Sequence, residues 1–209
     1  MSNKVKICIS IVCLLIATNI CGIPPGQCAA AAADITEETL WINLEVSEQQ
    51  KKQIDTIILE AYSQVKRIEK NQKSTDLYNF NNIFVLLQYT SKMNDIRKNT
   101  SDSIMQILNT QQRNVFEDQL EQVQATSRKS TAMMLSLDLT DNQKKLIVVS
   151  LLKTQKKIWS TIANQSSSWE QKRKKLNRIN KLQIISAKLS KDQRTMMAQW
   201  NVMFPADLN

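Results

Sequence analysis

Histidine is absent from this sequence of 209 residues, and all four cysteines precede residue 30. Histidine is the commonest general base near neutral pH and the commonest metal-ligating side chain. The chain also has no Gly-rich phosphate loop and no Ser/His/Asp or Cys/His arrangement. We therefore expect neither an enzyme nor a bound cofactor or metal.

Glycine, proline and aromatic residues are scarce as well. The chain holds two Gly and three Pro, and 5% of its residues are aromatic. Few turn-forming residues favour long helices over a sheet, since hairpins and tight turns depend on Gly and Pro. Few aromatic residues argue against a large globular core. The composition predicts an all-α protein that is elongated or curved.

Residues 1–33 have the pattern of a secretory signal peptide. Lys4 and Lys6 precede an apolar run of about 14 residues, which is too short for a comfortable membrane span. A run of alanines then offers small residues for signal peptidase. We expect cleavage there, which would remove every cysteine and export the mature chain to the periplasm. An uncleaved membrane anchor, or a lipoprotein attached through Cys21, are the alternatives.

The most informative pattern is a five-residue motif that occurs four times. Each copy reads apolar residue, small polar residue, two variable residues and Gln, which is the pattern of a capping box at a helix start. The small polar residue accepts a hydrogen bond from the first turn, and the Gln reaches back to the N-cap N–H. The expected capping pairs are Ser47 with Gln50, Asn109 with Gln112, Thr140 with Gln143, and Ser190 with Gln193.

The four boxes form two similar pairs, which indicates an internal duplication. The first and third boxes start about 93 residues apart, and the second and fourth about 81. The sequence after the first box, Gln50–Ile54, repeats after the third as Gln143–Ile147. We interpret the mature chain as two tandem helical units, at residues 34–131 and 132–209.

Hydrophobic periodicity places the helices around these boxes. In the first unit we expect a short lead-in before Asn43, then helices from Ser47 to about Gln72, from about Asn79 to Leu108, and from Asn109. In the second unit we expect helices that begin at Thr140, after Ser168 and at Ser190, the middle one reaching about Lys188. The expected buried stripes are Ile54, Ile57, Ile58, Ala61, Val65 and Ile68 in the first helix, and Leu146, Ile147, Leu151, Ile158 and Ile162 in the fourth.

Paired boxes, one opening a long helical hairpin and one opening its last helix, resemble the L-T-x-x-Q motifs of the Spy/CpxP family of bacterial periplasmic proteins. The resemblance spans residues from about 44 to about 204 and rests on repetition, spacing and the export signal together. It implies helical hairpins, each followed by a third helix. Because members of that family carry one unit and dimerise, two units in one chain imply a monomer with a pseudo-two-fold axis.

Positive charge is concentrated in the second sequence unit. Residues 34–132 hold 12 basic and 14 acidic side chains, whereas residues 133–209 hold 14 basic and 5 acidic ones. The densest basic run, residues 171–181, interleaves cations with apolar residues at helical spacing. We predict that it binds clients, although a solvated helix face is the simpler meaning of such a run. The expected client-binding residues are Trp169, Lys172, Lys175, Leu176, Arg178 and Ile179.

The resemblance and the charge together leave several functions open. One is an ATP-independent periplasmic chaperone that holds unfolded or partly folded proteins on a helical surface during the stress response. Another is a CpxP-like regulator that docks on the periplasmic domain of an envelope-stress sensor kinase. A structural adaptor is the third. Nucleic acid is not an expected partner, because export would separate the protein from it.

Overall fold

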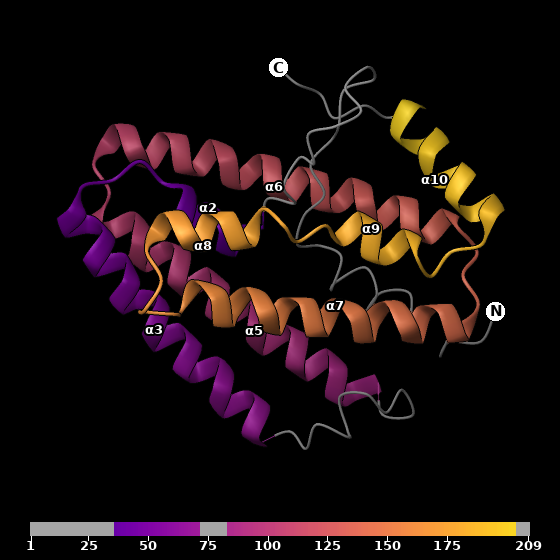
Figure 1. Ribbon diagram of the computed structural model, residues 1–209, viewed down its shortest axis with the longest axis horizontal. Helices are drawn as coiled ribbons and strands as arrows, with labels where there is room; N and C mark the ends of the chain where they lie inside the picture. Colours follow the sequence, from indigo (N-terminus) through magenta and orange to yellow (C-terminus); the bar gives the residue numbers. More distant parts are fainter. Residues whose placement is uncertain (1–35, 72–82, 204–209) are drawn as a thin grey trace. The chain divides into compact units, whose positions relative to one another are not determined.

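The computed structural model describes residues 36–71 and 83–203, and every regular element in these two ranges is an α-helix (Figure 1). The all-α prediction is therefore confirmed. The helices are α2 (Glu37–Asn43), α3 (Glu48–Asn71), α5 (Ile83–Ile107), α6 (Thr110–Ser136), α7 (Asp141–Ile162), α8 (Trp169–Leu176), α9 (Lys181–Ser186) and α10 (Lys191–Met203). The expected signal peptide and most of the turn expected between the first two long helices lie outside the described residues. None of the described helices combines the length and the apolar character that crossing a membrane requires.

Two helices differ from their predicted extents. The helix that begins after Asn109 does not give way to a linker near Thr131, because α6 continues to Ser136. The helix expected from Ser168 to about Lys188 is instead divided into α8 and α9. The break falls before Asn180, whose side-chain oxygen accepts a hydrogen bond of 2.8 Å from the Gln183 N–H and caps α9. Asn competes with the helical backbone for such bonds, which favours a new helix start over continuation.

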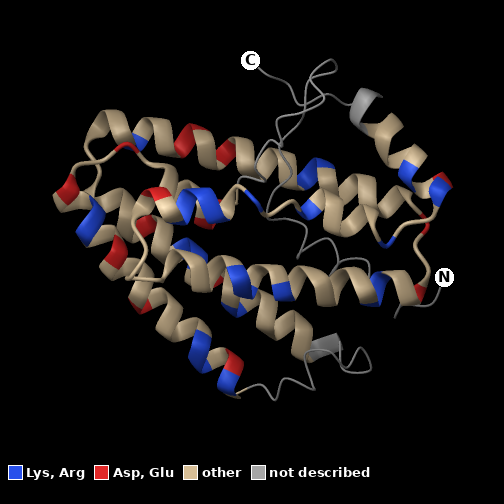
Figure 2. Ribbon diagram, viewed as in Figure 1, with Lys and Arg blue, Asp and Glu red and all other residues tan. Residues whose placement is uncertain are grey.

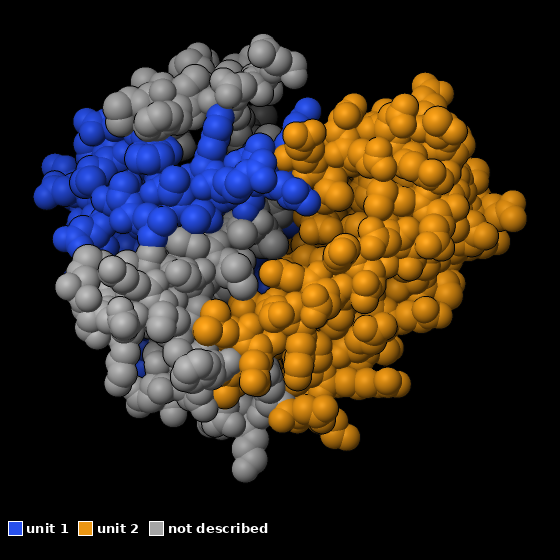
Figure 3. All heavy atoms as spheres, turned by 180° about the vertical axis from the view of Figure 1, so that it is seen from behind, with its two compact units in different colours: residues 1–36, 122–155, 176–209 blue, residues 37–121, 156–175 orange. Residues whose placement is uncertain are grey.

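The described chain divides into two compact units that are not consecutive in sequence (Figure 3). Of the described residues, unit 2 comprises 37–71, 83–121 and 156–175, and unit 1 comprises residue 36, 122–155 and 176–203. The division falls within α6, within α7 and before the last residue of α8. The first end of α6 and the second end of α7 belong to unit 2, and their other ends belong to unit 1.

The core of unit 2 forms where α3 and α2 pack on α5 (Figure 1). The predicted stripe of α3 is buried at Ile54, Ile58, Ala61 and Val65. Trp41 of α2 lies edge-on against Trp159 of α7, with ring centroids 5.5 Å apart and planes at 63°. Edge-to-face aromatic pairs of this kind stabilise a core by about 0.5–1.5 kcal/mol beyond the area they bury.

Buried apolar side chains of unit 1 lie in the later part of α6, in the first part of α7, and in α9, where Ile185 is buried. Met133 and Met134 of α6 are buried, as are Ile147 and Leu151 of α7. Leu146 was predicted to be buried with them, but it is 43% exposed. The apolar stripe of α7 continues through Val148 and Leu152 instead, which turns Leu146 toward solvent.

A polar network is buried in unit 2 between α2 and α5. The Arg97 guanidinium donates to Glu38 at 2.6 Å, and both side chains are almost fully buried. The Trp41 indole N–H donates to the Ser101 hydroxyl at 3.0 Å, and this hydroxyl donates to the Glu37 carboxylate at 2.8 Å. Burial raises the pKa of Glu37 above its usual value, and the neighbouring Glu38 carboxylate raises it further.

Glu37 therefore makes the stability of the protein depend on pH. A carboxyl whose folded pKa is raised stabilises the fold below the unfolded pKa of about 4.5, and this contribution is lost as pH rises through the folded pKa. Glu37→Gln removes the ionised form and keeps an acceptor for Ser101. We expect the stability of this variant relative to wild type to increase between about pH 4 and about pH 7, as measured by urea unfolding.

Glu48→Gln is the matched control with the opposite sign. Glu48 is exposed, and its hydrogen bond from Lys51 at 2.6 Å holds the pKa of its carboxyl below the usual value. Its contribution is present above the unfolded pKa and lost as pH falls, so the relative stability of Glu48→Gln should decrease over the same range. An equal pH slope for the two variants would contradict the assignment of Glu37.

Candidate functional site

All four predicted capping boxes form the same two hydrogen bonds. In the first box the Ser47 N–H donates to Gln50 Oε1 at 2.9 Å, and the Gln50 N–H donates to Ser47 Oγ at 3.2 Å. The same reciprocal pair joins Asn109 with Gln112, Thr140 with Gln143, and Ser190 with Gln193. The boxes open α3, α6, α7 and α10, so they fix where these helices begin.

In unit 2 the glutamines of the first and second boxes also bind each other. Gln50 Nε2 donates to Gln112 Oε1 at 2.8 Å, and Gln112 Nε2 donates back to Gln50 Oε1 at 3.4 Å. Gln50 Nε2 also donates to the Ile107 carbonyl, and Gln112 Nε2 to the Glu45 carbonyl, both at 3.0 Å. We call such a reciprocal pair a glutamine clasp. This one ties the start of α3 to the start of α6.

Unit 1 contains a second glutamine clasp with the same pattern. Gln143 Nε2 donates to Gln193 Oε1 at 2.7 Å, and Gln193 Nε2 donates back at 3.2 Å. The amide groups also donate to backbone carbonyls, Gln143 to Lys188 at 3.1 Å and Gln193 to Leu137 at 3.0 Å. The third and fourth boxes are thus joined as the first and second are, and the starts of α7 and α10 are held together.

The clasps explain why all four motifs end in Gln. In a capping box alone, Glu serves as well as Gln, because only an acceptor is needed at that position. A clasp also needs two side-chain N–H donors, which Gln has and Glu lacks.

A fifth capping box, formed by Ser168 and Gln171, opens α8 with bonds of 3.1 and 3.2 Å. The sequence predicted only that a helix begins after Ser168, although Ser168 and Gln171 have the S-x-x-Q spacing of a capping box. Within the described residues the amide of Gln171 donates to no other box.

The predicted client-binding residues Trp169 and Lys172 are turned into unit 2. Trp169 Nε1 donates to Asp55 Oδ2 at 3.1 Å, and Lys172 Nζ forms an ion pair with Asp55 Oδ1 at 2.7 Å. Lys172 is 1% exposed. The two side chains therefore anchor α8 to α3, and the prediction that they are available on an open surface is wrong. Neither the ion pair nor its partner was foreseen, because Asp55 lies more than 110 residues earlier in the sequence.

Arg173 adds a second anchor between α8 and the start of unit 2. Its Nε donates to the Ile42 carbonyl at 2.7 Å, and its Nη2 donates to the Leu44 carbonyl at 3.3 Å. Its guanidinium also lies 5.9 Å from the centre of the Trp169 ring. A helix of eight residues is marginal in isolation, so these contacts account for α8 being ordered.

The other four predicted residues do not share one helix face. Leu176 and Ile179 are buried in unit 1, with the end of α8 between them. The prediction that these residues form one surface assumed an unbroken helix from Ser168 to about Lys188. Lys175 and Arg178 are exposed, and Lys175 Nζ bonds to Ser167 Oγ at 3.0 Å. Within the basic run, Lys174, Lys175 and Arg178 are thus open to solvent, whereas Lys172 and Lys181 are buried, as are the apolar side chains Leu176 and Ile179.

Three exposed apolar side chains of unit 1 lie close in sequence to residues of its clasp. Leu135, Leu146 and Met196 are 49%, 43% and 45% exposed. Leu146 is the third residue after Gln143, and Met196 is the third residue after Gln193. Leu135 precedes Leu137, whose carbonyl binds Gln193, by two residues. We call these three residues the clasp patch.

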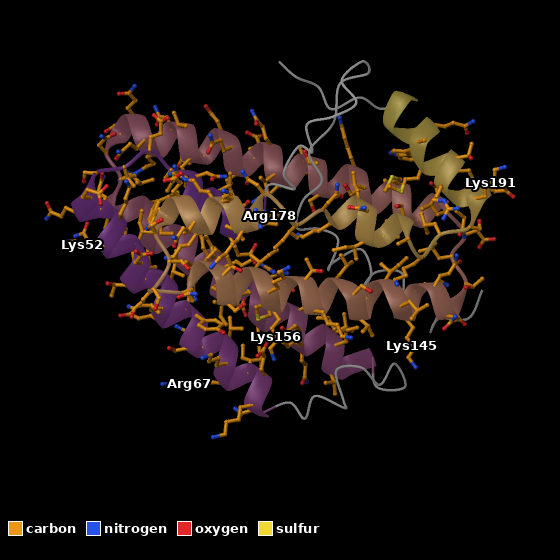
Figure 4. The ribbon with its side chains drawn as sticks, viewed as in Figure 1. Lys52, Arg67, Lys145, Lys156, Arg178 and Lys191 are labelled. Atoms are coloured by element: carbon orange, nitrogen blue, oxygen red, sulfur yellow. The ribbon has the colours of Figure 1, made fainter. Side chains whose placement is uncertain are left out.

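Unit 1 is also strongly basic. Its described residues include ten Lys and Arg against three Asp and Glu, a net charge of +7, whereas those of unit 2 include fifteen against thirteen, a net charge of +2 (Figure 2). Lys145 and Lys191, next to the two clasped helix starts, are exposed and extend away from the ribbon (Figure 4). The three exposed apolar residues of the clasp patch therefore belong to a unit with a large excess of positive charge.

The site offers little to a metal ion. Within residues 36–71 and 83–203, no three His, Cys, Asp or Glu side chains come close enough together to hold one. The methionines of unit 1 are mostly core side chains, since Met133, Met134 and Met197 are buried. The arrangement beside the clasp is suited to binding another molecule by apolar contact and charge.

Comparisons of this chain with protein-family models, with curated proteins and with solved structures found no match. The resemblance to the Spy/CpxP family stays a prediction that rests on the four capping boxes and their pairing.

The clasp of unit 1 predicts strong coupling between its two glutamines. Gln143→Ala and Gln193→Ala should each destabilise the protein by about 1–2 kcal/mol, because each leaves cap N–H and carbonyl groups without partners. The double variant should cost less than the sum, with a coupling energy of about 0.5–3 kcal/mol in denaturant unfolding.

Gln171→Ala is the matched control for the clasp. It removes the glutamine of a capping box that is not part of a clasp, so it should cost less than either clasp variant. Strict additivity of Gln143→Ala and Gln193→Ala, or an equal cost at Gln171, would show that the clasp contributes nothing beyond the boxes themselves.

Proposed function

We propose that this chain is a periplasmic, ATP-independent, chaperone-like protein that binds unfolded or partly folded clients, and that the clasp patch of unit 1 is its binding surface. The observation that carries the proposal is that three exposed apolar residues, Leu135, Leu146 and Met196, each lie within three residues of a residue bonded in one clasp, in a unit of net charge +7. The sequence pattern of an export signal at residues 1–33 supports the compartment.

Apolar side chains at this surface suit weak and general binding. Half-exposed Leu and Met side chains can bury further area against a client, at about 25 cal/mol per Å². Met adds a flexible, polarisable side chain that adapts to varied partners. Three such residues provide a contact that is modest in strength and selects for exposed apolar segments, which unfolded chains offer and folded ones hide.

We expect the positive charge of unit 1 to raise the rate at which clients associate more than it raises the affinity for them. Lys145 and Lys191 are exposed on the two clasped helix starts. Cations in such positions attract acidic segments over a distance comparable with the Debye length, about 8 Å at physiological salt. We therefore expect acidic clients to be captured faster than basic ones.

The clasp gives the patch a fixed geometry. Leu146 and Met196 each lie one helical turn from a glutamine of the clasp, and the two glutamines are joined by bonds of 2.7 and 3.2 Å. Two of the three patch residues are thus carried on tied helix starts, which limits the conformational entropy lost when a client binds.

Replacement of the two clasp-adjacent apolar residues tests this function. The double variant Leu146→Gln, Met196→Gln keeps helix-forming side chains at exposed positions, so the fold should survive. Losing about 1–2 kcal/mol of apolar contact should weaken client binding roughly tenfold. The measurement is suppression of the aggregation of a denatured acidic client, with circular dichroism as the folding check.

Val115→Gln is the matched control, since Val115 is 49% exposed and is the third residue after Gln112 in the clasp of unit 2. This variant should suppress aggregation as wild type does. A folded double variant that remains as active as wild type would sink the proposal for the patch. Wild-type protein that suppresses no aggregation would refute the chaperone function and leave the regulator or the adaptor.

A further inference from the structure

The methionines of the described chain differ sharply in exposure. Met196 is 45% exposed, whereas Met197, the next residue in α10, is 8% exposed. Met93, Met133 and Met134 are buried, and Met105 is intermediate. Among the described methionine side chains, Met196 is therefore the one most open to a reagent in solution.

Met196 also belongs to the proposed binding surface, so its oxidation would change that surface. It is the third residue after Gln193 of the clasp and a member of the clasp patch, together with Leu135 and Leu146. Oxidation turns a flexible apolar thioether into a polar sulfoxide. In a buried methionine this change disrupts the core, but at an exposed position it alters a surface and leaves the fold in place.

We infer that Met196 is a redox modification site at which sulfoxide formation switches off client binding by the clasp patch. The inference rests on the proposed function. The oxidant class is a hypohalous acid, with hypochlorous acid as the example. Sulfur loses two electrons and gains the oxygen, the O–Cl bond breaks, chlorine leaves as chloride, and the proton passes to water.

The change in binding follows from desolvation. A client that covers Leu146 and Met196 removes both from water, and a sulfoxide oxygen there loses its hydrogen bonds to water without gaining a partner. The affinity for clients should fall roughly tenfold. The sulfoxide is reversible by methionine sulfoxide reductases, so the switch can be reset.

Peptide mapping after limited oxidation tests the site itself. The purified protein is treated with a small excess of hypochlorous acid, and tandem mass spectrometry then separates oxidation at Met196 from oxidation at Met197. We expect Met196 to be oxidised at least about tenfold faster than Met197, because susceptibility follows exposure. Equal rates at the two residues would overturn the inference whether or not the protein binds clients.

Client capture by oxidised protein tests the switch. Each protein is compared with itself before and after oxidation, for wild type and for Met196→Leu, while circular dichroism monitors the fold. Wild type should lose capture roughly tenfold and regain it after treatment with the reductases, and Met196→Leu should show no oxidation-dependent loss. An equal loss in the variant would refute Met196 as the switch. Wild type that never captures clients would instead refute the proposed function, while the mapping result still stands.

Discussion

Each compact unit depends on one pair of side-chain amides. A clasp glutamine bonds to its own cap N–H through its oxygen, and to a partner glutamine and a distant backbone carbonyl through its nitrogen. No other side chain of similar reach offers an acceptor and two donors in one group except Asn, which is one methylene shorter. The clasps join residues 62 positions apart in unit 2 and 50 apart in unit 1. The same glutamines therefore cap their own helix and also bond to a helix start that is distant in the sequence.

The helix starts were predictable because a capping box is local. Ser47, Asn109, Thr140 and Ser190 each lie three residues from their glutamine, and periodicity gave the stripe of α3. The clasps were not predicted, since nothing within a box indicates which other box its amide will reach. The anchoring of Lys172 on Asp55 was missed for the same reason. Helical spacing in residues 171–181 suggested one client-binding helix face, but the helix breaks before Asn180.

The proposed function depends on the residues that lie close to the clasp of unit 1. Leu146 was expected in the core by periodicity, and its exposure is what forms the clasp patch with Leu135 and Met196. The charge asymmetry seen in the sequence remains, although its apolar complement lies beside the clasp and not along the basic run. The basic run instead supplies the anchors of α8, through Lys172 and Arg173.

Hydrogen exchange of the glutamine side-chain amides, followed by NMR, tests the clasps most directly. We predict that the Nε2 protons of the four clasp glutamines exchange with solvent markedly more slowly than those of Gln171, because each clasp glutamine donates hydrogen bonds to its partner and to a backbone carbonyl. Gln171 caps a helix in the same way but donates to no other box among the described residues. Equal exchange rates at all five glutamines would contradict the claim that each unit is held together by its own clasp.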